Sequence, residues 1–279
     1  MSKRRSSVQR VSNRKSKGSI RAFIPFVVGG LLLATIAGYM AIQPPPTDPK
    51  TFCPQNTENM GITALLIDVS DKLTNSQAAK LQNELKNIST VSEKRTSPFL
   101  KKGEKLVVYF VEPQGQVPSM IFSMCHPGDI ANKTISDELT QGAIFARKKW
   151  EKFSDDVMVS IDKKINSSKE MATSPIFEAI QFIRAKNFPP PDVMNSDVKY
   201  RFVIWSDFLQ NSDEGNHFRG LGDFQKILKR NPVELSGMEL YLFQMISKKY
   251  SKYQTNEHVA WWRRVFAKTG AELNMWEKI

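Results

Sequence analysis

Histidine and cysteine are scarce in this chain, which excludes several kinds of metalloprotein. The 279 residues include three histidines, His126, His217 and His258, and two cysteines, Cys53 and Cys125. No Cys-x-x-Cys pair occurs, although structural zinc sites need four such ligands at close spacing. The sequence also lacks a phosphate-binding loop and the Ser-His-Asp order of a hydrolase. We therefore expect neither a zinc site nor an enzyme.

Acidic residues are absent from positions 1–21, and charge of either sign is absent from positions 22–42. The first segment holds eight of the 40 Lys and Arg, and the second reads AFIPFVVGGLLLATIAGYMAI. A helix across a bilayer needs ~20 apolar residues, because hydrocarbon cannot satisfy a free backbone amide. Basic flanks stay on the cytoplasmic side. The sequence predicts a basic cytoplasmic segment at 1–21 and one transmembrane helix at 22–42.

A cleaved signal peptide is the main alternative to this anchor. Its apolar region usually spans about 7–15 residues, which is shorter than this run, but cleavage after Ala37 or Ala41 stays open. Arg4-Arg5 lies too far from the run for a twin-arginine signal. We favour a single-pass anchor in a bacterial inner membrane, with everything after Pro44 in the periplasm.

Beyond the anchor the composition is that of an ordinary globular protein. The net charge is +12, but residues 22–279 carry 32 basic and 28 acidic side chains, a net charge of +4. The basic excess therefore reports membrane topology, and we expect no nucleic-acid partner. Residues 43–57 are Pro-rich and predict an extended spacer. Residues 58–279 remain for one domain.

Strand-like and helix-like segments alternate through this domain. Buried strands are expected at 61–68, 106–111, 117–124, 201–205, 239–246 and near Met275. Helices are expected at 75–88, 136–166 with a break near Ser154, 175–186, 224–229 and 256–268. We predict an α/β fold with a doubly wound, mostly parallel sheet, one antiparallel edge strand at 117–124, and helices on both faces. Function is then expected at the carboxyl ends of the strands.

Polar residues follow two of these strands in a recognisable order. The first expected strand ends in DVSDK (68–72), the fourth ends in SDF (206–208), and SPIFEAI (174–180) opens a helix between them. This order resembles the von Willebrand factor A domain and its metal-ion-dependent adhesion site. That site takes Asp-x-Ser-x-Ser after the first strand, a Thr before a helix, and an Asp after the fourth strand.

The resemblance implies a protein-binding module and names its residues. Asp68, Ser70, Ser174 and Asp207 would supply oxygen ligands to Mg²⁺, and an acidic side chain of the partner would complete the coordination. Lys72 replaces the second Ser of the motif, and its ammonium could neutralise the carboxylates without a metal. These five residues form the predicted partner-binding set. The simpler alternative is that both Asp residues accept backbone N–H bonds and that Ser174 caps a helix.

Both cysteines follow the apolar segment, so an extracytoplasmic domain would place them in an oxidising compartment. Composition alone leaves open a disulfide or two separate buried thiols. The topology that the resemblance implies brings the end of the third strand to the edge where the first strand begins. We therefore predict a Cys53–Cys125 disulfide.

The leading hypothesis is a membrane-anchored extracytoplasmic module that recruits a protein partner, with no small-molecule substrate. One alternative is a structural subunit of a membrane complex that binds through its anchor, where Gly29, Gly30 and Gly38 permit close helix contact. Another is a phosphotransfer enzyme of the haloacid dehalogenase kind. That enzyme needs Asp-x-Asp, and Ser70 stands at its second acidic position.

Overall fold

The computed structural model describes residues 35, 47–55, 60–89, 100–127 and 143–279. The chain divides into two units, 1–44 and 45–279. The predicted basic segment lies outside the described residues, as does the predicted transmembrane helix apart from Thr35. Within the described ranges, no helix combines the length and the hydropathy needed to cross a bilayer.

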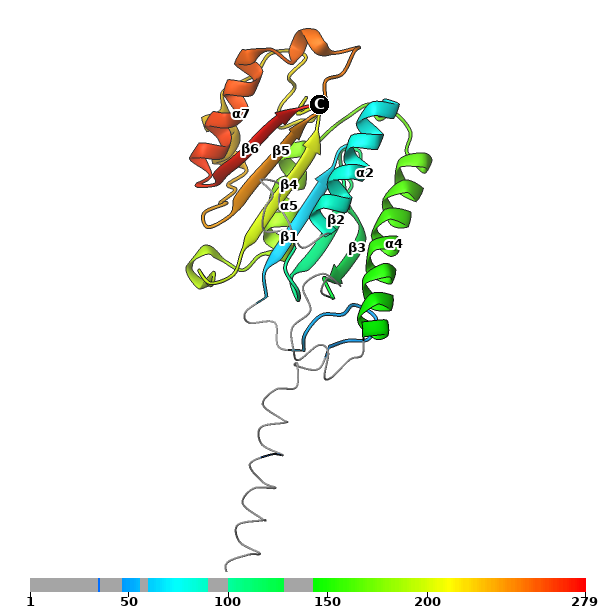
Figure 1. The fold of residues 1–279 in the computed structure, drawn as a ribbon. Coiled ribbons are helices and arrows are strands. Elements are labelled where there is room, and N and C mark those ends of the chain that lie inside the picture. Colours follow the sequence, from blue (N-terminus) through cyan, green and yellow to red (C-terminus); the bar gives the residue numbers. More distant parts are fainter. Residues whose placement is uncertain (1–34, 36–46, 56–59, 90–99, 128–142) are drawn as a thin grey trace, which may run out of the picture. The chain divides into compact units, whose positions relative to one another are not determined.

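Six strands of the second unit form one sheet. They are β1 (Ile62–Ile67), β2 (Lys105–Phe110), β3 (Ser119–Cys125), β4 (Tyr200–Ser206), β5 (Glu239–Gln244) and β6 (Glu272–Lys278). The order across the sheet is β3-β2-β1-β4-β5-β6 (Figure 1). Every neighbouring pair is parallel except β2 and β3. The predicted α/β fold, with a mostly parallel sheet and one antiparallel edge strand, is confirmed.

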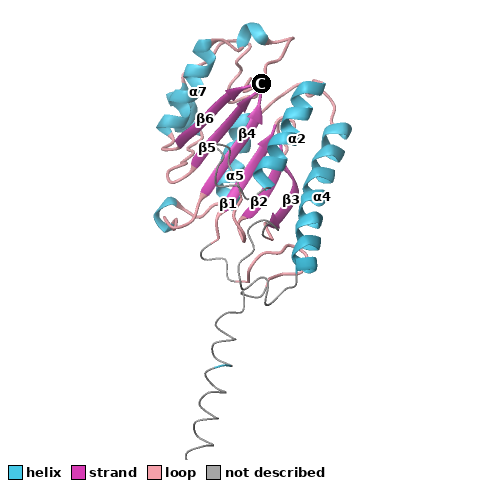
Figure 2. Ribbon diagram, in the orientation of Figure 1, coloured by secondary structure: helices cyan, strands magenta, loops and turns pink. Residues whose placement is uncertain are grey.

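Helices cover both faces of this sheet, which explains why its central strands are buried and mainly apolar. Along β1, Ala64 and Leu66 belong to one core cluster, whereas Leu65 and Ile67 belong to the other. The helices are α2 (Asn75–Ser89), α4 (Ala143–Ser167), α5 (Ile176–Asn187), α6 (Phe224–Arg230) and α7 (Asn256–Lys268). Figure 2 shows α2 and α4 in front of the sheet and α5 behind it. A strand buried on both faces reads as a continuous apolar run.

The expected break near Ser154 is wrong, because α4 continues through this residue. Phe153, Val157 and Ile161 recur every four residues and are fully buried in the core against the sheet. This apolar stripe outweighs the weak helix propensity of the Ser-Asp-Asp segment at 154–156. The part of the prediction at 136–142 lies outside the described residues.

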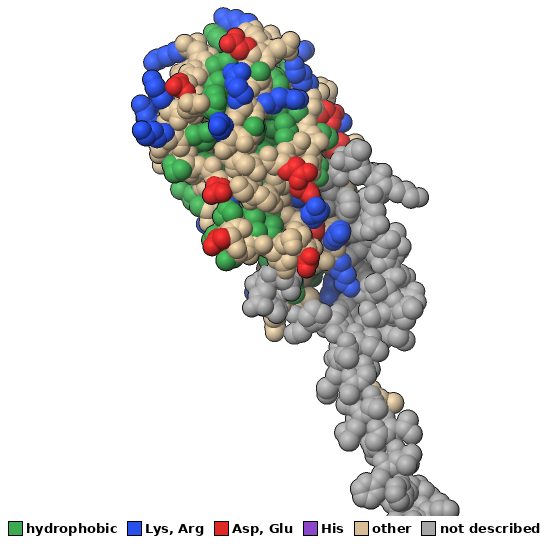
Figure 3. Space-filling view, turned by 90° about the vertical axis from the view of Figure 1, so that its left-hand side faces the viewer, with side chains coloured by type: hydrophobic (Ala, Val, Ile, Leu, Met, Phe, Trp, Pro, Cys, Tyr) green, Lys and Arg blue, Asp and Glu red, His purple; other side chains and the backbone are tan. Residues whose placement is uncertain are grey.

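The C-terminal helix matches its prediction in both bounds and orientation. Trp261, Trp262 and Phe266 of α7 are buried, whereas Arg263 and Arg264 are exposed. The face of the molecule that carries α7 presents mainly Lys and Arg among its charged side chains in the upper half (Figure 3). The sequence pattern was sufficient to predict the bounds and the buried face of this helix, because its apolar residues recur at helical spacing.

The predicted disulfide is confirmed. Cys53 and Cys125 are bonded, with their Cα atoms 4.7 Å apart. Cys125 pairs with Lys105 at the start of β2, so the bond lies near the amino end of the central strands. Cross-links of this sequence separation, 72 residues, stabilise a fold by ~4 kcal/mol in the chain-entropy description.

The described part of the predicted spacer is a turn and not an extended segment. The Phe52 amide donates to the Asp48 carbonyl (2.8 Å), and the Asp48 amide donates to the Cys53 carbonyl (2.9 Å). The Asp48 carboxylate accepts the amides of Lys50 and Thr51, which stabilises the turn. Phe52 is buried in the core, so this segment packs against the domain.

Candidate functional site

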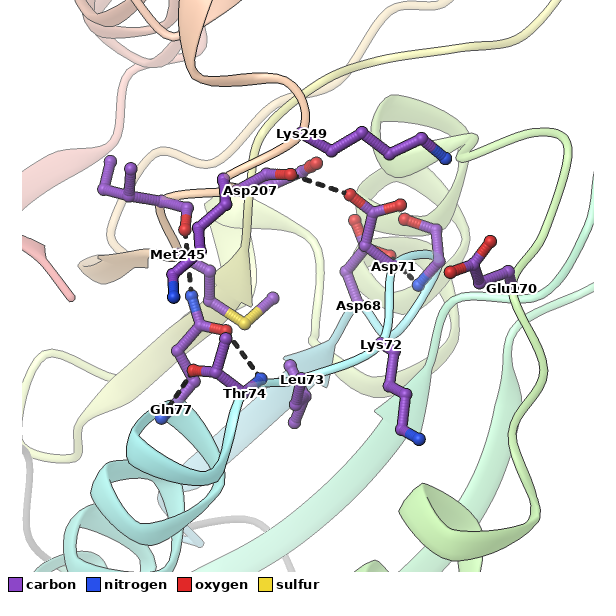
Figure 4. A pocket seen from close by; sticks show the side chains of 14 residues that line it. Asp68, Asp71, Lys72, Leu73, Thr74, Gln77, Glu170, Asp207, Met245 and Lys249 are labelled. Carbon is purple, nitrogen blue, oxygen red and sulfur yellow. Dashed lines mark hydrogen bonds between the residues drawn. The ribbon is translucent and has the colours of Figure 1, made fainter.

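The two predicted aspartates lie at the same edge of the sheet. Asp68 follows β1 and Asp207 follows β4, and these strands are parallel neighbours at which the strand order reverses. Asp68, Ser70, Lys72 and Asp207 all line one cavity of about 170 Å³ (Figure 4). Four of the five residues predicted from the sequence therefore line this one cavity.

The Asp68 carboxylate is the centre of the hydrogen-bond network beneath this cavity. Its Oδ2 atom accepts the hydroxyls of Ser206 (2.8 Å) and Ser174 (3.0 Å), and its Oδ1 atom accepts the Ser70 amide (2.9 Å). The residue is only 1% exposed. Segments that are far apart in the sequence thus converge on one carboxylate. Ser206 was not predicted, although its place beside Asp207 at a strand end was a usable signal.

Ser174 belongs to this network but does not line the cavity. The alternative that Ser174 caps a helix is wrong, because α5 has Pro175 as its N-cap and no side-chain bond from that residue. Gln210 does the capping from a distant loop, where its Oε1 atom accepts the Phe177 amide (2.9 Å). The Ser174 hydroxyl is consequently committed to Asp68.

Asp207 is buried with little to balance its charge. Its Oδ1 atom accepts the Leu209 amide (2.8 Å), and the residue is 6% exposed. Burial raises the pKa of Asp207 well above its usual range, and the nearby charge of Asp68 raises it further. Both Asp68 and Asp207 accept backbone amides two residues ahead, as the simpler alternative predicted.

The residue after Asp207 fixes the path of the chain. Phe208 has a φ of 60°, a left-handed conformation that is rare for bulky residues. Its carbonyl accepts three ring N–H groups, from His258 (2.8 Å), Trp262 (2.8 Å) and His217 (3.2 Å). A strained backbone persists only where its surroundings hold it. This triple contact therefore holds the turn that directs Asp207.

Lys249, and not Lys72, is the lysine whose charge acts on Asp71, an acidic residue of this cavity. Figure 4 shows the Lys249 side chain extending over Asp71, while Lys72 points away from Asp68 and Asp207. Burial raises the pKa of Asp71, and a hydrogen bond from Ser247 Oγ (3.1 Å) and the charge of Lys249 oppose that rise. Sequence reasoning missed Lys249 and Asp71. The Ser-Lys-Lys segment after β5 was the available signal, because β5 ends at the same edge.

The predicted metal ligands are assembled only in part. Asp68, Ser70 and Asp207 line the cavity and would hold a hard cation such as Mg²⁺ through oxygen atoms. Ser174 lies beneath the cavity, bonded to Asp68. Within the described ranges, no three His, Cys, Asp or Glu side chains are grouped as metal ligands. Magnesium binding stays a prediction, with three of its four ligands facing the cavity.

Comparison with the models of known protein families and with curated proteins finds no match to this chain. The resemblance to the von Willebrand factor A domain therefore stays a prediction, carried by the strand-end residues.

Proposed function

We propose that this chain is a membrane-anchored, extracytoplasmic protein-binding module that holds its partner at the carboxyl edge of the sheet. The observation that carries the proposal is the burial of Asp68 and Asp207 at the ends of neighbouring strands, beside one cavity. Two carboxylates buried near each other destabilise a fold. Such costs are commonly kept where a binding or catalytic role requires them.

The proposed location draws on two independent features. The Cys53–Cys125 disulfide is typical of an oxidising compartment. The uncharged segment at 22–42, with its basic flank, is typical of a single-pass anchor with a cytoplasmic N-terminus. Together they favour a periplasmic position for the domain at 58–279.

A binding role agrees with the state of Asp68 better than phosphotransfer does. A nucleophilic aspartate must offer a free oxygen to its substrate. Asp68 is 1% exposed, and its two oxygens accept three hydrogen bonds. Ser70 stands where the phosphotransfer enzymes place their acid. These contacts favour a role in binding a partner over a role in phosphotransfer.

Capture of the partner from native membranes tests the proposal. The tagged full-length chain is compared with Asp207→Asn and Asp68→Ala, and with Asp197→Asn as a control. Asp197 is an exposed carboxylate in the loop before β4, at the opposite edge of the sheet. We expect the first two variants to lose the partner and the control to retain it. Equal capture by all of them would contradict binding at this edge.

The alternative of binding through the anchor has its own test. A chain that lacks residues 1–43 retains the whole carboxyl edge. Our proposal expects this chain to capture the solubilised partner, whereas the anchor hypothesis expects capture to fail.

A further inference from the structure

We infer that the cavity at the carboxyl edge receives a cationic side chain of the partner, an arginine or a lysine, with its charged head toward Asp207 and Asp68. The inference rests on the proposed function, because it names the chemical group by which the partner is recognised. It differs from the metal-bridged contact that the resemblance implies, in which the partner supplies an acid.

The floor of the cavity offers an acceptor that is not satisfied within the described residues. Asp207 is 94% buried, and its Oδ1 atom accepts the Leu209 amide. Its other carboxylate oxygen has no hydrogen-bond donor in the described parts of the chain. Since Asp207 lines the cavity, this oxygen is available to a donor that enters it. A cationic donor that enters the cavity would form a charge-assisted hydrogen bond with this oxygen.

No cation of the described chain forms an ion pair with Asp68 or Asp207. Lys72 points away from them, and Lys249 lies over Asp71 at the rim (Figure 4). The Lys249 ammonium is 4.7 Å from the centre of the Tyr250 ring. The floor therefore presents two carboxyl groups that form no ion pair within the described residues, although Lys72, Lys248 and Lys249 also line the cavity.

The walls of the cavity suit the aliphatic part of a long cationic side chain. Leu73, Met245 and Ile246 are the apolar residues that line it. Among the polar residues that also line the cavity, Gln77 is already hydrogen-bonded: it donates to the Ile246 carbonyl (3.2 Å) and accepts the Thr74 amide (3.0 Å). Arginine and lysine bury their methylene stems on apolar surface and present a charged head at the tip. The volume of about 170 Å³ is far more than one water needs.

Asp71 and Glu170 add negative charge at the entrance, where both line the cavity. They are more exposed than Asp207, so they act on an approaching cation through solvent and chiefly affect its rate of arrival. Among cations, a guanidinium has the advantage of several donors in one plane, which match the geometry of a carboxylate.

Methionine NMR on the full-length chain in a membrane mimetic tests this inference directly. Met245 lines the cavity, and the 11 methionines give few enough methyl signals to assign it with Met245→Leu. The probes are N-acetyl-arginine amide and N-acetyl-citrulline amide, which has the same shape without the charge, and Mg²⁺ alone. Asp207→Asn tests the floor, and Asp197→Asn is the matched control.

We expect the arginine probe to shift the Met245 signal saturably, and the citrulline probe to bind about tenfold or more weakly, because a charge-assisted hydrogen bond is lost. Asp207→Asn should weaken the arginine probe by a similar factor, and Asp197→Asn should not. Equal binding of both probes would overturn the inference. So would saturation by Mg²⁺ alone that excludes the arginine probe, since the cavity would then be a metal site.

The results distinguish failure of this inference from failure of the proposed function. If Asp207→Asn abolishes partner capture but the arginine probe does not bind, the partner uses this edge by other chemistry and only the inference is lost. If the probe binds but partner capture survives Asp207→Asn, the cavity accepts cations while the proposed contact face is wrong.

Discussion

Asp68 and Asp207 are buried at the ends of the neighbouring strands β1 and β4. Burial raises the pKa of Asp207, and the charge of Asp68 raises it further. The fold therefore keeps an arrangement that opposes its own stability at neutral pH. The proposed binding of a partner at this edge would relieve the arrangement.

Asp207→Asn should stabilise the free protein at pH 7. A pKa raised on folding means that the Asp207 contribution is greatest below the ordinary value of 3.8 and is lost as pH rises through the folded value. The amide removes this loss, about 1.4 kcal/mol for each pKa unit, and its oxygen can still accept the Leu209 amide. Urea unfolding of the variant and of Asp197→Asn measures the change. If Asp207→Asn is less stable than the wild-type protein, the claim that the buried Asp207 carboxyl group destabilises the free fold is contradicted.

His217 should make the fold sensitive to acid in the opposite sense. Burial, and then the charge of His258, lower the pKa of His217 from 6.5 to about 3. Its stabilising contribution is therefore complete above pH 6.5 and is lost as pH falls toward 3, at about 1.4 kcal/mol per pH unit. His217→Phe should flatten this part of the stability profile in urea titrations between pH 7 and pH 4. An unchanged slope would show that His217 does not titrate with unfolding.

Gln254→Leu should loosen the cavity without changing its charge. The Gln254 amide group donates to the carbonyls of Asp207 (3.0 Å) and Met245 (2.6 Å), and its oxygen accepts the Ser247 amide (2.8 Å). Loss of these buried bonds should destabilise the protein by ~1–3 kcal/mol and weaken partner capture. Gln225→Leu, on an exposed face of α6, is the control for thermal unfolding and capture. Full stability in Gln254→Leu would show that the bonds do not support this edge.

Replacement of both Cys53 and Cys125 by Ser should lower the free energy of unfolding by ~4 kcal/mol. The bond lies near the amino end of the central strands, away from Asp68 and Asp207. Capture of the partner by the molecules that remain folded should therefore be unchanged. Non-reducing mass analysis of the native chain checks the bond itself, and two free thiols in protein purified from the native compartment would refute it.

The parts of the fold that the sequence could predict are those set by local pattern. The runs at β1, β2 and β4 are apolar because both faces of the sheet are covered, so they could be found without knowledge of their neighbours. The meeting of Asp68 with Asp207 followed from one rule, that the ends of parallel strands share an edge. The disulfide required the strand order as well.

The parts that could not be predicted depend on contacts between distant segments. Gln210 caps α5 from a loop about 30 residues away along the chain, and Phe208 is held by rings from α7 and from His217. Whether Lys72 or Lys249 lies over Asp71 depends on the direction of each side chain, which the spacing of residues in a loop does not determine. Likewise, the continuity of α4 came from its packing and not from its own propensity.

Site-specific photo-crosslinking in living cells tests most directly whether the partner is held at the carboxyl edge. A photoreactive residue at Lys72, which is exposed beside the cavity, should yield one covalent adduct with the partner. The same residue at Asp197, before β4, should yield none. Adducts from Asp197 but not from Lys72 would show that the partner is held elsewhere, and the account of this edge would be wrong.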